Sequence, residues 1–144
     1  MVRKSTAVWK GSGMEGTGVL TTQSGVLHDQ PYSFNTRFKS EDGKAGTNPE
    51  ELVAAAHAGC YAMALSFALT NSGHAPQELR VSAGVDVQRG DAGFSIVGIA
   101  LDLEARVSGL DAAKFAELAD DAKKNCPISK ALAAVPITLT KKLL

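Results

Sequence analysis

The residues with the clearest capacity for chemistry are the only two cysteines of this 144-residue chain, Cys60 and Cys126. A cysteine reacts as its thiolate, so its surroundings decide whether it is a nucleophile or an inert apolar side chain. No Cys-x-x-Cys motif is present, which excludes a local thioredoxin-type pair. The two thiols are therefore either inert core residues or a redox pair that the fold must bring together.

The two cysteines differ in their sequence surroundings. Cys60 lies within "AAAHAGCYAMALSFAL" (54–69), a stretch typical of a buried helix, and His57 precedes it by three positions on the same helix face. His57 either tunes Cys60 or simply packs. Cys126 precedes Pro127 and suits the N-cap of a short helix, where backbone N–H groups favour a thiolate. The dipole argument thus favours Cys126 as the thiol with the lower pKa.

Composition excludes several function classes. Fifteen Lys and Arg balance 15 Asp and Glu, and the scattered charges predict neither a nucleic-acid nor an anionic-membrane partner. The start of the sequence, "MVRKSTAVWKGSG", has no apolar run of signal-peptide length, and no stretch approaches 18 uninterrupted apolar residues, so we expect a cytoplasmic protein. The three histidines lack metal-ligand spacing, and we expect neither a metal nor another cofactor. The length predicts a single domain, 1–144.

The first half of the chain reads as strands followed by one long helix. Alternating apolar and polar residues predict an antiparallel meander from Lys4 to Phe38, and a charged, glycine-bearing loop follows (39–49). The helix is predicted from Pro49 to Asn71, with Asn48 as N-cap and two glutamates in its first turn. It is apolar nearly all round, which predicts a core helix enclosed on every side.

The second half predicts a hairpin, two helices and a last strand. The hairpin strands span 79–89 and 93–107, joined by "GDAG". An amphipathic helix begins near Ser108 and Asp111, a short helix covers 128–135, and a strand covers 136–143. The apolar side of the amphipathic helix is predicted at Leu110, Ala113, Phe115 and Leu118. Strands grouped in runs favour the α+β class with antiparallel sheets.

Three segments carry a resemblance to a known family. "YSFNTRF" (32–38), "GTNPEELVAAAHAGCYAMAL" (46–65) and "NCPIS" (125–129) resemble the signature segments of the OsmC/Ohr family of osmotically inducible and organic-hydroperoxide-resistance proteins. The resemblance covers essentially the whole chain. It favours the OsmC branch, because the family's arginine matches Arg37 in "NTRF", whereas the first hairpin, where the Ohr branch carries its arginine, has "GSGMEGTGVL".

The resemblance implies a thiol-dependent peroxidase that prefers organic hydroperoxides. By position, Cys60 matches the peroxidatic cysteine, Cys126 the resolving cysteine, and Arg37 and Glu50 the polar pair that assists the reactive thiol. The implied fold is an OsmC-like α+β fold with antiparallel sheets around a long central helix, in an intertwined homodimer with active sites at the interface. The implied reductant is a dithiol or lipoyl-type reductant; the sequence leaves its identity open among a lipoyl group, a thioredoxin-like protein and a small thiol.

Two alternatives stay open at this point. Ten residues of helix rise about 15 Å, so either the helix begins after Glu50, or Glu50 and Arg37 reach the cysteine of a partner subunit. The function also has a competing interpretation, a non-catalytic protein that binds thiols or apolar ligands or senses redox state. An aromatic and methionine lining from Tyr32, Phe34, Tyr61, Met63 and Phe67 would suit alkyl hydroperoxides, although the same residues would serve as core.

Overall fold

The computed structural model describes all 144 residues as two compact units, residues 1–52 and 53–144, and each is described here by itself. Unit 1 contains a small three-stranded sheet and one short helix. Unit 2 contains a second three-stranded sheet and most of the helices. The α+β class predicted from the sequence is confirmed.

Unit 1 is built on an antiparallel meander of β1 (Ser5–Lys10), β2 (Thr17–Thr22) and β3 (Gln30–Ser33). The prediction that strand structure continues to Phe38 is wrong, because α1 (Phe34–Phe38) follows directly. Ser33 caps this helix: its hydroxyl accepts from the Thr36 N–H at 3.2 Å, and the Thr36 hydroxyl accepts from the Ser33 N–H at 2.9 Å. This reciprocal cap turns the chain into a helix, so Arg37 lies on a helix and not on a strand.

Gly18 in β2 explains how two large rings fit on one face of this sheet. Trp9 and Tyr32 are its cross-strand partners, and their ring centroids are 5.3 Å apart. A Cβ at position 18 would lie 2.5 Å from the Tyr32 ring and 2.7 Å from the Trp9 ring, which is closer than van der Waals contact allows. The absence of a side chain therefore lets the rings meet over the middle strand.

The long helix α2 runs from Pro49 to Asn71, with the bounds predicted from the sequence. At its start the Asn48 side chain accepts from the Glu51 N–H at 2.8 Å, which confirms the predicted N-cap. At its end Gly73 adopts φ 86°, and the His74 N–H donates to the Leu69 carbonyl at 2.9 Å. A left-handed glycine of this kind satisfies the last carbonyls of a helix and ends it.

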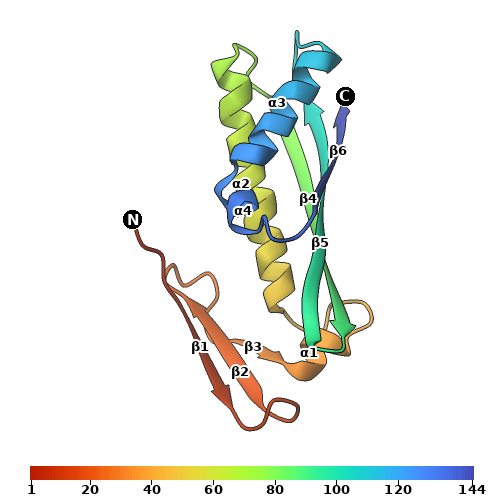
Figure 1. The fold of residues 1–144 in the computed structure, drawn as a ribbon. Coiled ribbons are helices and arrows are strands. Elements are labelled where there is room, and N and C mark those ends of the chain that lie inside the picture. Colours follow the sequence, from red (N-terminus) through yellow and green to blue (C-terminus); the bar gives the residue numbers. More distant parts are fainter. The chain divides into compact units, whose positions relative to one another are not determined.

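Unit 2 packs its helices on one face of the sheet formed by β4 (Glu78–Gly90), β5 (Gly93–Arg106) and β6 (Ile137–Leu143) (Figure 1). The helices α3 (Ala112–Asn125) and α4 (Pro127–Ala131) connect β5 to β6. The hairpin of β4 and β5 is antiparallel as predicted, whereas β6 pairs parallel with β5. The helical crossover returns the chain to Ile99, near the middle of β5, and β6 then runs in the same direction as β5. This sheet is therefore mixed and not purely antiparallel.

The core of unit 2 lies between the sheet and the helices. Its buried members come from α2, β5, the turn after β5, α3 and the residue before α4: Tyr61, Leu65, Leu69, Leu101, Leu103, Ala105, Val107, Phe115, Ala119, Ala122 and Cys126. On α3 the prediction holds for Phe115, and Leu110 and Leu118 pack against the core, but Ala113 is exposed. Ala119 and Ala122 continue the buried stripe that begins at Phe115.

One side of α2 stays uncovered in the subunit. Tyr61, Leu65 and Leu69 are buried, but Met63 and Phe67 expose 63% and 65% of their surface. The expectation that α2 is enclosed on every side is therefore wrong for a single chain. By length and composition α2 could also span a membrane, a test that core helices of soluble proteins pass as well. Its buried side belongs to the core of unit 2.

Candidate active site

The fold brings the two cysteines together. Cys60 lies on α2 and Cys126 is the N-cap residue of α4, and their sulfur atoms are 3.0 Å apart. Both are free thiols; Cys126 is fully buried and Cys60 is partly exposed. A disulfide has an S–S bond of about 2.0 Å, so a shift of about 1 Å would join them. This geometry suits reversible disulfide formation between α2 and α4.

The two thiols have opposite pKa shifts. The pKa of Cys60 is raised, and burial is the largest cause. The hydrogen bond with Cys126 and the negative charge of a Cys126 thiolate raise it further. Burial also tends to raise the pKa of Cys126. Four donors outweigh this effect and lower the pKa of Cys126: the Cys60 thiol, the Ile128 N–H, the Ser129 N–H and the Ser129 side chain. Within unit 2 Cys126 is therefore the thiol with the lower pKa, as the dipole argument predicted.

His57 contacts a residue that the sequence did not single out. Its Nε2 lies 2.8 Å from the Ser129 hydroxyl oxygen, and both side chains are buried. The other ring nitrogen, Nδ1, is buried without a hydrogen-bond partner. Burial lowers the pKa of His57, so the ring is neutral near pH 7. Because its hydrogen bond goes to Ser129, His57 does not act on Cys60 by a direct hydrogen bond.

In unit 1 the structure pairs Arg37 with Glu50. The Arg37 Nη2 and Nε atoms donate to the two carboxylate oxygens at 2.6 and 3.1 Å, a bidentate arrangement. The Glu50 carboxylate is desolvated, which raises its pKa, but the Arg37 hydrogen bonds and charge outweigh this and leave the pKa of Glu50 lowered. Glu50 is therefore an anion that holds the guanidinium, and it is not suited to accept a proton.

Aromatic rings surround Arg37. A pocket in unit 1 is lined by Trp9, Tyr32, Phe34, Phe38 and Arg37, together with Gly13 and Ser33. The Arg37 guanidinium carbon lies 4.7 Å from the centre of the Phe38 ring. The pocket thus combines one cation with an apolar wall, which suits a ligand with a polar reactive end and a hydrocarbon body.

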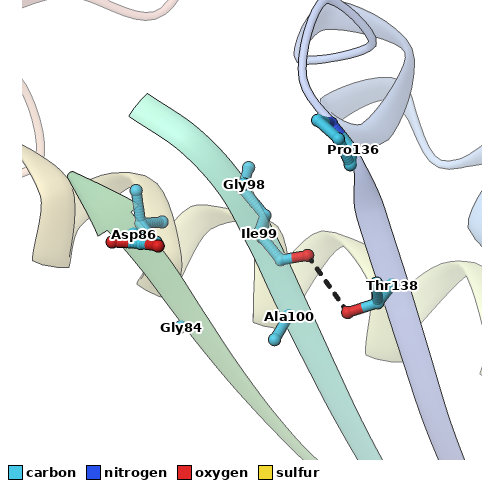
Figure 2. Close-up of a pocket in the computed structure, with 8 residues that line it drawn as sticks. Gly84, Asp86, Gly98, Ile99, Ala100, Pro136 and Thr138 are labelled. Carbon is cyan, nitrogen blue, oxygen red and sulfur yellow. Dashed lines mark hydrogen bonds between the residues drawn. The ribbon is translucent and has the colours of Figure 1, made fainter. Parts of the chain in front are cut away.

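A second hollow lies in unit 2, where β6 begins beside β5 (Figure 2). Its residues are small or apolar apart from Asp86 and Thr138, and the Thr138 hydroxyl donates to the Ile99 carbonyl at 3.5 Å. It contains neither a thiol nor a histidine. No group of three or more His, Cys, Asp or Glu side chains could hold a metal ion. We therefore place the chemistry at the two thiols and not at this hollow.

The structure arranges the four predicted site residues as two pairs, Cys60 with Cys126 and Arg37 with Glu50. Their catalytic roles stay predictions. Ser129 is not among the residues predicted for the site. The Cys-Pro-Ile-Ser spacing could have indicated it, because this spacing puts Ser129 three residues after the N-cap, where a side chain turns back toward the cap. Of the proposed lining residues, Tyr61 is core: its hydroxyl donates to the Ala119 carbonyl at 3.2 Å.

Comparisons with known proteins give a consistent result. A family model described as "OsmC-like protein" matches residues 41–140. The chain is 47% identical to the Peroxiredoxin OsmC of Escherichia coli over 98% of its own length and 96% of that protein. It is 32% identical to the organic hydroperoxide resistance protein OhrB of Bacillus subtilis over 79% of its length and 80% of that protein.

Solved structures agree on the fold. The crystal structure of Bacillus subtilis OhrB matches with a TM-score of 0.70 at 27% identity, covering 96% of this chain and 98% of that one. An OsmC-like protein from Mycoplasma pneumoniae matches with a TM-score of 0.77 at 15% identity, covering 100% and 98%, and supports the fold alone. From the family match, the near-full-length identity and the shared fold, the chain belongs to the OsmC-like family, in its OsmC branch.

Proposed function

We propose that the protein is a thiol-dependent peroxidase that reduces organic hydroperoxides to alcohols with Cys60 and Cys126. The observation that carries the proposal is the 3.0 Å separation of these two free thiols, which come from distant parts of the chain. The relationship to proteins named peroxiredoxin and organic hydroperoxide resistance protein supports it.

In the first step the Cys60 thiolate attacks the terminal oxygen of R–O–O–H. The O–O bond breaks, the alkoxide takes a proton and leaves as R–OH, and Cys60 becomes a sulfenic acid. Because burial and Cys126 raise the pKa of Cys60, a cation must stabilise its thiolate. Arg37 is that cation in our proposal; its Nη2 and Nε hold Glu50, and its remaining N–H groups are available to a sulfur or a peroxide oxygen.

We propose that Arg37 and Glu50 act on Cys60 of the partner subunit. Of the two alternatives left open by the sequence, a helix that begins after Glu50 is wrong, because α2 begins at Pro49 and runs to Asn71. Ten residues of continuous helix correspond to about 15 Å of rise, more than one guanidinium can bridge. Action across a dimer interface is the alternative that remains.

A homodimer is supported by the apolar surface that each unit leaves uncovered. The exposed side of α2 carries Met63 and Phe67, which are 63% and 65% exposed. Unit 1 contributes no buried hydrophobic side chain to the core, and all residues of β1 are exposed. A small sheet without a packed face is not stable alone in water. A second copy that covers both surfaces is the occupant we propose.

In the second step Cys126 resolves the sulfenic acid. The Cys126 thiolate attacks the Cys60 sulfur, the S–O bond breaks, and the hydroxide leaves with one proton as water. A dithiol then reduces the Cys60–Cys126 disulfide through a mixed disulfide and is itself oxidised to a disulfide. We place this cycle in the cytoplasm, where the reducing poise keeps two thiols at this distance free between turnovers.

The test is a thiol count. Reduced protein is mixed with cumene hydroperoxide, and free thiols are counted in the wild type, in Cys60→Ser and in Cys126→Ser. We expect the wild type to lose two thiols per chain and to consume hydroperoxide repeatedly once a dithiol is supplied. Cys126→Ser should stop at a Cys60 sulfenic acid, and Cys60→Ser should not react.

The same experiment separates the competing function. A thiol- or apolar-ligand-binding protein, or a redox sensor, would react at most once per chain and would not turn over with a dithiol. Unchanged thiols in the wild type would contradict the peroxidase outright. Reaction at Cys126 in the Cys60→Ser variant would show that the two cysteine roles are exchanged.

A further inference from the structure

A buried serine and histidine lie beside the thiol pair with no role in the proposed peroxide chemistry. His57 Nε2 and the Ser129 hydroxyl oxygen are 2.8 Å apart, His57 is fully buried and Ser129 is 7% exposed. Ser129 also lies near Cys126, because Cys126 is the N-cap of α4 and Ser129 is in the first turn of that helix, and its side chain is among the groups that lower the pKa of Cys126. A polar pair in such a place costs desolvation energy, so its arrangement needs a reason.

The unpartnered ring nitrogen selects the tautomer of His57. A neutral imidazole carries its proton on one nitrogen only, and Nδ1 is buried without a partner. An orphaned lone pair is tolerated better than an orphaned N–H in a protein interior. The proton therefore belongs on Nε2, which donates to the Ser129 oxygen.

This tautomer fixes the direction of the serine hydroxyl. Once the Ser129 oxygen accepts from His57 Nε2–H, its own hydrogen is free to point to another acceptor. We assign the Cys126 sulfur as that acceptor, because Cys126 is the N-cap of the helical turn that carries Ser129, and the Ser129 side chain is among the groups that lower the Cys126 pKa. The result is a directed chain of donors from His57 through Ser129 to Cys126.

We infer that His57 and Ser129 are positioning residues for the resolving cysteine, a role that rests on the proposed peroxidase function. The neutral His57 orients the Ser129 hydroxyl, and the hydroxyl holds the Cys126 sulfur as an anion aimed at Cys60. The pair takes no proton in the reaction and touches no peroxide. It accelerates the step in which Cys126 attacks the Cys60 sulfenic acid. Its loss should not slow the attack of Cys60 on the peroxide, because a less anionic Cys126 raises the pKa of Cys60 less.

The expected size of the effect follows from two opposing consequences. A hydrogen bond to a charged group changes an equilibrium by at least about tenfold, so losing the Ser129 hydroxyl should reduce the thiolate fraction of Cys126 by about that factor. The remaining thiolate is more basic and therefore a better nucleophile. The rate of its attack should fall only by about the square root of the tenfold loss in thiolate fraction. We therefore expect disulfide formation to slow about threefold from this cause, and up to about tenfold if orientation is lost as well.

The experiment is a single turnover of the full-length protein with cumene hydroperoxide, with dimedone present as a trap for sulfenic acid. Mass spectrometry then gives the dimedone adduct and the disulfide over time. In Ser129→Ala we expect peroxide consumption no slower than in the wild type, slower disulfide formation and more adduct. His57→Met should behave in the same way, whereas His57→Gln, whose amide N–H can replace Nε2–H, should restore most of the rate.

Two comparisons distinguish positioning from a general loss of packing. His57→Met added to Ser129→Ala should slow disulfide formation no further, because His57 acts only through Ser129. Ser72→Ala breaks a second serine–histidine contact, that of Ser72 with His74 at 3.4 Å, and should leave both steps unchanged. A wild-type rate of disulfide formation in Ser129→Ala, or an additive double variant, would overturn the inference.

A titration tests the same chain without peroxide. In a Cys60→Ser background, the ultraviolet absorbance of the Cys126 thiolate should rise at a pH about one unit higher when Ser129 is alanine. Tyr61, the other titratable group that faces Cys126, has a raised pKa and stays neutral over this range. An unchanged midpoint would overturn the inference. If the wild type forms neither adduct nor disulfide, the peroxidase proposal fails, and the role in resolution fails with it.

Discussion

Substitution of Phe67 by glutamate should dissociate the proposed dimer without unfolding the subunit. Phe67 lies on α2 outside the core of its own chain and exposes 65% of its surface. A phenylalanine of about 200 Å² would then bury about 130 Å², which corresponds to about 3 kcal/mol at 25 cal per Å². In a two-fold interface the contribution counts twice, so the loss approaches about 6 kcal/mol, or more than about 10⁴-fold in the dissociation constant.

The assay is sedimentation equilibrium over a range of protein concentrations, with hydroperoxide turnover measured on the same samples. We expect Phe67→Glu to be monomeric at concentrations where the wild type is dimeric, and its activity to fall with the dimer fraction because Arg37 then has no partner thiol. The control is Ala113→Glu, an exposed helical position on α3 without a large apolar side chain. A Phe67→Glu variant that stays dimeric, or a monomer with full activity, would refute the proposed interface.

Three further predictions concern single side chains. Glu50→Gln should slow peroxide attack about tenfold, because Arg37 loses its bidentate contact with the carboxylate. Stopped-flow measurement of peroxide consumption checks this, and an unchanged rate would argue against a role of the Arg37–Glu50 pair. Tyr61→Phe should lower the free energy of unfolding by about 1 kcal/mol, because the buried hydrogen bond from the Tyr61 hydroxyl to the Ala119 carbonyl is lost. Activity should persist, as urea denaturation and turnover would show. Burial lowers the pKa of His57 from its ordinary 6.5, so the stability that its neutral ring contributes is present above pH 6.5 and is lost as the pH falls through the pKa of the folded state. Acid should therefore destabilise the wild type more than His57→Gln, which urea titrations at several pH values would measure.

Local sequence signals predicted most of the elements correctly. The cap at Asn48, the proline at helix position one and the closing turn before Gly73 gave both ends of α2. The "GDAG" turn gave the hairpin of β4 and β5, and Asp111 gave the start of α3. These signals are interactions between residues a few positions apart, so they can be recognised without the fold.

Other features were misread because competing signals overlapped. The segment around Arg37 alternates like a strand, but the reciprocal cap of Ser33 and Thr36 makes it a helix. The parallel pairing of β6 depends on where the crossover through α3 and α4 returns the chain, which no local pattern specifies. The apolar sequence of α2 predicts a helix enclosed on every side, but it does not reveal which molecule covers the side that the single chain leaves exposed.

The sequence by itself determined the α+β class, the ends of α2 and the two candidate thiols, and it indicated Cys126 as the thiol with the lower pKa. Its family resemblance predicted the polar pair of Arg37 and Glu50. Only the tertiary structure brought the two sulfur atoms to 3.0 Å, identified the groups that lower the Cys126 pKa and revealed the contact between His57 and Ser129. The physical reason is distance along the chain: capping and periodicity act over a few residues, whereas a thiol's pKa depends on burial and donors that arrive from α4 and α2 only when the core closes.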